Sequence, residues 1–283
     1  MNLRTLVLTA ISMLAFAANS LLCRLALANG SIDSASFGSL RLLSGALMLS
    51  AILYLRSARR PVSGGADWLA AGMLWAYVVC FSFAYVALSA GTGALILFGA
   101  VQLTMFGAGV WSGERLRASA WGGLLLAVGG FLFLVAPGLE APPPLAAVLM
   151  TLAGVAWGVY SLRGRHQVDA LAASAGNFRR AAPLALLVSV VLVSQLHMDG
   201  RGAAMAIASG AITSGLGYVL WYSALRGLSA MRASMVQLSV PPLAAIGGVW
   251  LLSEPLTVRL LLSSAAILGG VALALMARSR VGA

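Results

Sequence analysis

The sequence predicts an all-α integral membrane protein with ten transmembrane helices, arranged as two inverted five-helix repeats. Three observations lead to this prediction: the composition, the length of the apolar runs and a weak internal repeat. Of the 283 residues, 61% are hydrophobic and 9% are charged, and the mean hydropathy is +0.97. A soluble domain carries about 25% charged residues. One buried core cannot hold so much apolar surface, so lipid must solvate part of it, which excludes a soluble globular protein.

The apolar runs are continuous, which favours helices over a transmembrane barrel. Barrel strands alternate apolar and polar residues over about ten positions, whereas residues 124–128 are all apolar. A helix crosses about 30 Å of hydrocarbon with about 20 apolar residues. Breaks in hydropathy therefore predict ten spanning helices, over residues 5–28, 35–55, 67–88, 91–111, 118–136, 144–162, 177–196, 202–225, 229–251 and 257–277.

Turn-forming and charged residues occupy the connections between these segments, and such residues end or separate helices. The connections include Asn29-Gly30-Ser31, Arg59-Arg60-Pro61, Glu114-Arg115, Pro142-Pro143-Pro144 and Ser253-Glu254-Pro255. None is long enough to hold a soluble domain. The N-terminal run resembles a signal peptide, but it continues to about Ala28, the length of a span, so we interpret it as an uncleaved first helix.

The basic residues predict the orientation. All 18 are Arg, against seven acidic residues, and they lie mostly between apolar runs. We interpret this excess as topology determinants rather than as a nucleic-acid footprint. With a cytoplasmic N-terminus, fourteen arginines flank the inner side, and the four on the outer side are Arg24, Arg41, Arg201 and Arg259. The prediction is a multi-pass protein of the bacterial inner (cytoplasmic) membrane, with both termini cytoplasmic.

A shift of 140 residues indicates an internal repeat. It places Glu114 on Glu254 and Gly129-Gly130 on Gly269-Gly270. Residues 1–140 and 141–283 then each hold five helices, and an odd number inverts the second copy in the membrane. Inverted repeats are typical of secondary transporters, whose site lies near the membrane midplane between the two copies.

Two matching helix ends resemble a known family. The second half contains Val249-Trp250-Leu251-Leu252-Ser253-Glu254-Pro255-Leu256 with a Gly pair in the last helix, and the first half contains Val110-Trp111-Ser112-Gly113-Glu114-Arg115-Leu116. Both resemble the drug/metabolite transporter superfamily, EamA type, and within it the chain is similar to the bacterial aromatic amino acid exporters. The resemblance implies export of amino acids or other small metabolites through a central cavity. The family often has Pro in both equivalent helices, whereas here Val101-Gln102 is Pro-free opposite Pro241-Pro242.

The acidic residues all lie in or beside connections: Asp33, Asp67, Glu114, Glu140, Asp169, Asp199 and Glu254. Ionisable residues inside a membrane mark proton or ion pathways, and no carboxylate falls in mid-span here. We therefore expect a cavity suited to a solute of little net charge, and a gradient-driven carrier rather than one coupled to ions through a buried carboxylate.

Polar and aromatic side chains within the spans are the candidate substrate-binding residues. The cavity is predicted between the six segments that carry nearly all of them, residues 5–28, 67–88, 91–111, 144–162, 202–225 and 229–251. The candidates are Asn19, Tyr77, Tyr85, Phe98, Gln102, Trp157, Tyr160, Tyr218, Trp221, Tyr222, Gln237 and Ser239, with Pro241 and Pro242 as a hinge. The aromatic rings suit an apolar or aromatic side chain. Hydrogen bonding between helices and ordinary core packing remain open for each of them.

The predicted function is an inner-membrane secondary transporter that exports small neutral metabolites, above all amino acids with aromatic or other apolar side chains, by alternating access. The alternatives are an exporter of other metabolites or drugs, or a channel. We expect no enzyme activity, cofactor or metal, because Cys23, Cys80, His166 and His197 form no ligand cluster. The expected partners are a small-molecule substrate and membrane lipid, with no nucleic acid. The Gly109-x-x-x-Gly113 and Gly154-x-x-x-Gly158 patterns are assigned to packing within one chain rather than to dimerisation, and we expect a functional monomer.

Overall fold

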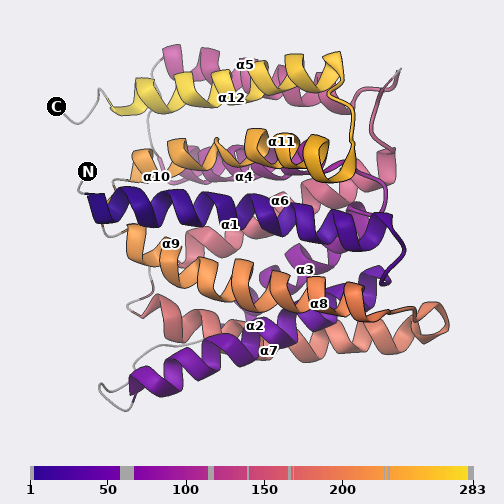
Figure 1. Cartoon of the computed structure of the whole chain (residues 1–283). Helices are drawn as coiled ribbons and strands as arrows, with labels where there is room; N and C mark the ends of the chain where they lie inside the picture. The colour runs from indigo at the N-terminus through magenta and orange to yellow at the C-terminus, as the bar shows by residue number, and fades with distance from the viewer. Residues whose placement is uncertain are drawn as a thin grey trace.

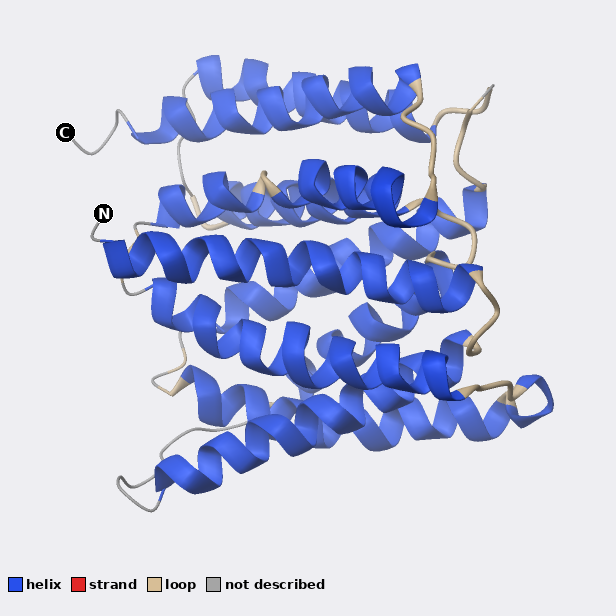
Figure 2. Ribbon diagram, in the orientation of Figure 1, coloured by secondary structure: helices blue, strands red, loops and turns tan. Residues whose placement is uncertain are grey.

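The structure is a computed structural model that describes residues 3–57, 67–113, 118–138, 140–164, 167, 169–225, 227–228 and 230–279. Within these ranges the chain is helical apart from turns, loops and an isolated antiparallel bridge between Ile32 and Met198 (Figure 2). The predicted all-α class is therefore confirmed for the described part of the chain.

The helices follow one another through short connections. They are α1 (Leu3–Ala28), α2 (Ser34–Ser57), α3 (Trp68–Ala84), α4 (Ala90–Trp111), α5 (Ala118–Val135), α6 (Pro144–Gly164), α7 (Ala170–Val191), the 3₁₀ turn η1 (Val193–Gln195), α8 (Gly200–Ala208), the π-helix η2 (Ser209–Leu216), α9 (Gly217–Leu225), α10 (Ala230–Gln237), α11 (Val240–Leu252) and α12 (Val258–Ser279).

Eight helical segments in the described residues are long and apolar enough to cross a membrane. Six correspond to predicted spans that are single helices; the other two are Gly200–Leu225, which runs through α8, η2 and α9, and Ala233–Leu252, which runs through α10 and α11. Two predicted spans do not meet these criteria of length and hydropathy. α3 has 17 residues, and α7 carries Asn177, Arg179 and Arg180 in its first half.

The helices lie side by side and run alternately in opposite directions (Figure 1). α1 begins and α12 ends at the same end of the bundle, the left in Figure 1. α5 and α12 pack together at one edge, α2 and α7 pack together at the other, and α1, α3, α4, α6 and α9 lie between them. Although α2 lies at an edge, it also contacts α3 and η2. Part of α2 therefore lies near the centre of the molecule.

Two predicted helices differ most from the structure. The segment predicted over 177–196 begins at Ala170, where the Asp169 carboxylate accepts a hydrogen bond from the Ala172 amide and caps α7. The segment predicted over 229–251 is interrupted at Leu238-Ser239, directly before Pro241. Proline has no N–H and its ring clashes with the preceding turn, so the helix starts again at that point. Hydropathy alone missed both features.

Close backbone contact at glycines joins α5 to α12. A Cβ atom placed on Gly270 would lie 2.5 Å from the Gly123 carbonyl oxygen and 2.6 Å from the Ala127 nitrogen. The predicted internal packing is confirmed at Gly154, where a Cβ would lie 2.6 Å from the Leu97 carbonyl oxygen on α4, but not at Gly113, where an added Cβ meets no atom within 4 Å. Neither Gly270 nor Gly154 has room for a side chain, because the neighbours are backbone atoms.

Gly270→Ala should therefore destabilise the protein, by about 1–3 kcal/mol, since a methyl group forced against backbone moves the helices apart. The adjacent Gly269→Ala is the matched control, because no atom lies within 4 Å of its added Cβ, and replacing a helical Gly by Ala is neutral or stabilising there. Melting temperatures in detergent measure both. Equal melting temperatures for the two variants would contradict the close packing of α5 on α12.

Candidate functional site

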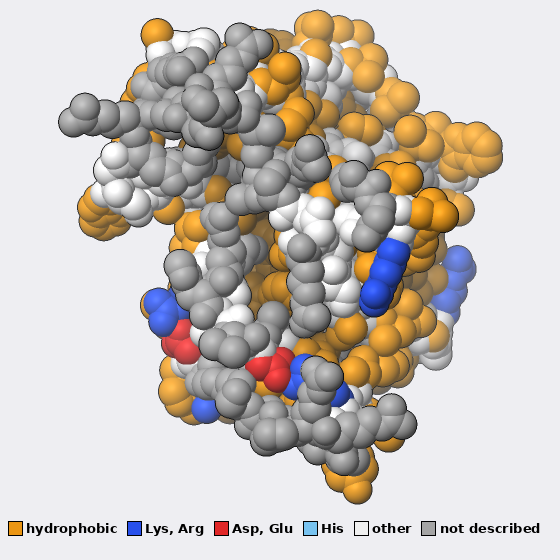
Figure 3. Space-filling model, turned by 90° about the vertical axis from the view of Figure 1, so that its left-hand side faces the viewer, with side chains coloured by type: hydrophobic (Ala, Val, Ile, Leu, Met, Phe, Trp, Pro, Cys, Tyr) orange, Lys and Arg blue, Asp and Glu red, His pale blue; other side chains and the backbone are white. Residues whose placement is uncertain are grey.

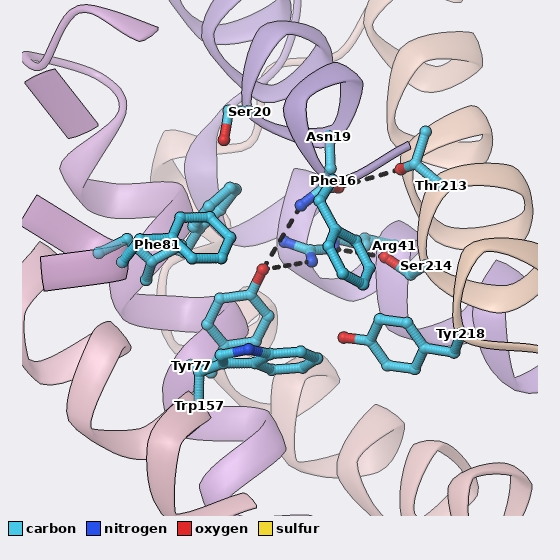
Figure 4. Close-up of a pocket in the computed structure, with 12 residues that line it drawn as sticks. Phe16, Asn19, Ser20, Arg41, Tyr77, Phe81, Trp157, Thr213, Ser214 and Tyr218 are labelled. Carbon is cyan, nitrogen blue, oxygen red and sulfur yellow. Dashed lines mark hydrogen bonds between the residues drawn. The ribbon is translucent and has the colours of Figure 1, made fainter. Parts of the chain in front are cut away.

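A small cavity lies in the middle of the bundle (Figure 4). Its lining comes from α1, α2, α3, α4, α6, η2 and α9, and consists of Phe16, Asn19, Ser20, Arg41, Tyr77, Phe81, Leu97, Phe98, Trp157, Thr213, Ser214 and Tyr218. The volume open to the centres of water-sized molecules is about 20 Å³, which is room for one or two waters. In this conformation the cavity is contracted around its own side chains.

Helical spacing brings the lining residues together. Phe16, Asn19 and Ser20 are three and four residues apart on α1, and Tyr77 and Phe81 are four apart on α3, so each set shares one helix face. Thr213 and Ser214 lie in the π-helix η2. A π-helical stretch changes which face its residues present and often marks a functional site.

Aromatic rings form one wall of the cavity. The ring centroid of Trp157 lies 4.9 Å from that of Tyr77 and 5.2 Å from that of Tyr218, and Tyr77 lies 5.3 Å from Phe81. These are contact distances at which rings gain both dispersion and quadrupole energy. The wall can therefore pack against an apolar or aromatic group.

A hydrogen-bonded network forms the polar side of the cavity. Asn19 Oδ1 accepts from Ser209 Oγ at 2.6 Å, and the Thr213 hydroxyl shares its one hydrogen between Asn19 Oδ1 at 3.2 Å and the Ser209 carbonyl oxygen at 2.8 Å. Asn19 Nδ2 donates to the Tyr77 hydroxyl at 3.4 Å. The network joins α1, α3 and η2, so the amide oxygen of Asn19 is already engaged.

Arg41 lies in this network, and the sequence interpretation of it was wrong. We had placed it at the outer flank, but its side chain is 1% exposed. Its Nη2 donates to the Tyr77 hydroxyl at 2.9 Å, its Nε donates to Ser214 Oγ at 3.3 Å, and Nη1 has no partner. The guanidinium carbon lies 5.0 Å from the Tyr77 ring centroid and 4.9 Å from that of Phe81.

This finding changes the expected electrostatics of the site. We inferred a solute of little net charge from the acidic residues alone, yet the cavity contains a fixed positive charge. The signal was present in the sequence, because Arg41 lies inside the predicted span 35–55 and an intramembrane charge marks a functional site by default.

The structure brings only some of the predicted site residues to the cavity. Asn19, Tyr77, Phe98, Trp157 and Tyr218 line it. Sequence reasoning missed the rest of the lining: Phe16, Ser20, Arg41, Phe81, Leu97, Thr213 and Ser214. No residue of the predicted span 229–251 lines the cavity, whereas α2, which we left out, supplies Arg41.

Four predicted aromatic residues lie outside the cavity. Tyr85 packs behind Phe81 with ring centroids 4.7 Å apart, and Trp221 packs against Phe16 at 5.9 Å. Tyr160 and Tyr222 line a separate hollow with Asn177.

The predicted polar residues Gln102, Gln237 and Ser239 donate hydrogen bonds to main-chain carbonyl oxygens near Pro241 and Pro242. Gln102 Nε2 donates to the Ser234 oxygen at 3.4 Å, Gln237 Nε2 to the Ala233 oxygen at 3.3 Å, and Ser239 Oγ to the Val236 oxygen at 2.7 Å. Pro241 and Pro242 lie in the first turn of α11, directly after the interruption of the helix. We predicted a hinge at these two prolines. Substrate contact by Gln102, Gln237 and Ser239 remains a prediction.

Ion pairs tie the helices together at the end where α1 begins. Arg56 of α2 pairs with Asp169 before α7, and Arg163 of α6 pairs with Asp67 before α3. Acidic and basic side chains lie next to each other on this face (Figure 3). Burial opposes ionisation of Asp169, but the Arg56 guanidinium and the Leu171 and Ala172 amides outweigh it, so the pKa of this carboxyl lies below 3.8.

A third ion pair closes the opposite end. Arg24 Nε of α1 donates to Glu254 Oε1 at 2.9 Å, and Glu254 Oε2 accepts from the Ala90 amide at 2.8 Å. Arg24 Nη1 also donates to the Tyr85 and Val86 carbonyls, at 3.0 and 2.8 Å. These bonds hold the end of α1 against the α3–α4 and α11–α12 connections.

Known proteins share this architecture. The model of the EamA-like transporter family matches residues 144–276. An uncharacterized protein of Pseudomonas aeruginosa is 56% identical over 278 residues, which cover 97% of this chain and 96% of that protein.

The chain belongs to the EamA-like transporter family. A crystal structure of a protein 21% identical to it has a TM-score of 0.63 and matches 94% of this chain and 98% of its own, which shows a common fold. The EamA-like family consists of membrane transporters and not of enzymes, as the sequence predicted. The narrower likeness to aromatic amino acid exporters remains a prediction.

The Arg56–Asp169 pair of this EamA-like transporter should stabilise the fold in a pH-dependent way. The folded-state pKa of Asp169 is depressed, so its contribution is present above the unfolded-state pKa and is lost as pH falls through the folded one. Asp169→Asn keeps the helix cap but removes the charge. It should cost about 0.2–1 kcal/mol near pH 7, since the pair is partly exposed.

Melting temperatures of wild type and Asp169→Asn in detergent, between pH 7 and pH 3, measure this effect. The gap between them should narrow below about pH 4, close to the ordinary carboxyl pKa. Arg56→Gln should reduce the same pH-dependent part but not abolish it, because the Leu171 and Ala172 amides still favour the charged carboxylate. A gap that stays constant down to pH 3 would show that Asp169 acts only as a helix cap.

Proposed function

We propose that this EamA-like transporter exports small neutral metabolites, above all amino acids with aromatic or other apolar side chains, across the bacterial inner membrane by alternating access. The observation that carries the proposal is the central cavity, which combines an aromatic wall with a polar network. Ion pairs join the helices at both ends of the bundle, above and below this cavity in the direction of the helix axes. Such a combination of apolar walls and a few placed polar groups is typical of small-molecule sites. The cavity holds too little free volume for a continuous pore, which favours a carrier over a channel.

The proposal includes ten spanning helices in two inverted repeats, residues 1–140 and 141–283. The 140-residue shift superposes the helix boundaries well: α5 at 118–135 falls on α12 at 258–279, and α4 at 90–111 falls on α10 and α11 at 230–252. The family match begins at residue 144, next to the proposed boundary. α7, with 22 residues, is about 33 Å long and can span a bilayer.

The packing of the helices supports the same symmetry. Under the shift, α1 corresponds to α6 and α3 to η2 and α9. The pair α3–α6 is then equivalent to the pair α9–α1, and the pair α4–α6 to the pair α11–α1. All four pairs are in contact. A pseudo-two-fold axis through the bundle would produce this pattern and place the site between the repeats.

Alternating access requires each end to open while the other stays closed. The Arg24–Glu254 pair would open on one side, and the Arg56–Asp169 and Arg163–Asp67 pairs on the other. None of the residues that line the described cavity is a carboxylate. We therefore propose that flux follows the solute gradient without a proton carried on a buried acid.

Flux into proteoliposomes tests this function directly. A panel of labelled amino acids should give saturable uptake that continues when an ionophore collapses the proton gradient. Loss of all uptake with the ionophore would contradict uncoupled transport. Unitary currents in a planar bilayer would favour a channel instead.

Trp157→Ala should weaken the binding of aromatic substrates more than the binding of small aliphatic ones. Removing a stacking ring from a desolvated site costs about 1–3 kcal/mol, or about 5–150-fold in affinity. Trp250→Ala is the matched control, because Trp250 of α11 is 85% exposed and does not line the cavity. Competition between labelled and unlabelled solutes in proteoliposomes measures the preference. An inserted, folded Trp157→Ala protein with unchanged preference would remove Trp157 from the site.

Both termini should lie in the cytoplasm. With Cys23 and Cys80 replaced by Ser, Met198→Cys at the far end of the bundle should react with an impermeant thiol reagent in intact cells. Leu3→Cys should react only after the membrane is permeabilised. Both native residues are exposed, at 49% and 76%, so access to the side chain does not limit either reaction. The reverse labelling pattern would invert the proposed orientation.

A further inference from the structure

Arg41 is a buried cation that has no negatively charged partner among the described residues. Its hydrogen bonds go to two hydroxyl groups, and its flat face lies on two aromatic rings. The described carboxylates that form ion pairs do so with Arg24, Arg56 and Arg163 at the ends of the bundle. Asp33 and Asp199 accept from backbone amides near the outer connections.

This arrangement is costly unless something else supplies the counter-charge. A guanidinium stays protonated inside proteins, and a buried ion without a partner carries a desolvation penalty of several kcal/mol. Hydroxyl oxygens and ring faces compensate for only part of it. A charge held in this way in a transporter's central cavity is therefore poised for an anionic group of the solute.

Two residues of the cavity lining, Arg41 and Tyr77, have unused hydrogen-bond donors. Arg41 Nη1 is buried without a partner. The Tyr77 hydroxyl oxygen accepts from both Asn19 and Arg41, which leaves its own hydrogen free to donate. Both residues line the cavity, and Figure 4 shows the guanidinium and the Tyr77 hydroxyl facing each other inside it. Two adjacent donors suit the two oxygens of a carboxylate.

The charge count selects a carboxylate over a phosphate. The cavity supplies one positive charge, which one carboxylate neutralises, whereas a phosphate monoester carries about two negative charges at pH 7. The cavity is also poor in acceptors for an ammonium group. No carboxylate lines it, and Asn19 Oδ1 already accepts a hydrogen bond from Ser209 Oγ at 2.6 Å.

We propose that Arg41, assisted by the Tyr77 hydroxyl, binds the carboxylate of the transported solute. The substrate class is a small monocarboxylate with an apolar or aromatic body, whose carboxylate is required and whose amino group is dispensable. The body packs on Trp157 and its neighbours. This inference rests on the proposed transport function and defines its substrate class by the carboxylate rather than by the amino group.

Three compounds with one aromatic body separate the groups: phenylalanine, 3-phenylpropionate, which lacks the amino group, and phenethylamine, which lacks the carboxylate. Binding to the purified full-length protein is measured by tryptophan fluorescence and by the ligand-induced rise in melting temperature. The dissociation constants of phenylalanine and 3-phenylpropionate should lie within about tenfold of each other. Phenethylamine should bind at least about 30-fold more weakly than 3-phenylpropionate. Equal binding of the amine and the acid would overturn the proposal.

Arg41→Met removes the charge and keeps most of the volume. It should weaken the binding of 3-phenylpropionate at least about 30-fold, and the melting temperature of the ligand-free variant shows whether it is folded. Arg259→Met is the control, since Arg259 bonds to the Leu134 and Ala136 carbonyls away from the cavity. Unchanged acid binding by a folded Arg41→Met protein would refute the role of Arg41.

A second variant serves if Arg41→Met does not fold. Tyr77→Phe keeps the ring and removes one donor to the carboxylate. It should therefore weaken the binding of 3-phenylpropionate about tenfold and leave the binding of phenethylamine unchanged. Equal losses for both compounds would contradict the proposal. If none of the three compounds binds to wild type, and the flux panel shows no saturable uptake, the transport function itself fails. Uptake of other solutes with no preference for carboxylates would leave transport standing and refute only the Arg41 site.

Discussion

The hydrogen bonds of the buried Arg41 guanidinium constrain the centre of this protein more than any other interaction. A charged group among membrane helices must find its partners inside the protein, because lipid offers none. Arg41 therefore holds α2 to α3 through Tyr77 and to η2 through Ser214. Asn19 joins α1 to the same network. The cavity lies where these four elements meet, so the site and the packing of the bundle share one set of contacts.

Local backbone irregularities make this network geometrically possible. The π-helical stretch η2 brings Thr213 and Ser214 to the cavity. Gly210, in the same stretch, lets η2 approach α2 so closely that a Cβ would lie 2.1 Å from the Arg41 carbonyl oxygen. A regular helix with a larger residue at this position would keep the two elements apart. The irregular backbone thus lies at the site, as it commonly does in transporters.

The fold and the site carry different kinds of information about function. A likeness at 21% identity with a TM-score of 0.63 shows that the architecture persists while most side chains change. The chemistry of the solute must be argued from the side chains that line the cavity, because one fold can serve many substrates. Here the informative side chain is a single cation without a counter-ion, surrounded by rings and hydroxyl groups.

The sequence by itself determined the membrane class, most helix boundaries, the family and five of the aromatic and polar side chains that line the cavity. Hydropathy and charge vary along the chain, so they predict where helices begin and end. Which side chains meet depends on the rotation of each helix about its axis, and a break at Pro241 or a π-helical stretch changes that rotation. Arg41 lies about 10 Å into α2, where a long side chain could equally have extended back to the membrane surface. Only the tertiary structure decided that it points inward, because Tyr77 and Ser214, which come from distant parts of the chain, are its partners.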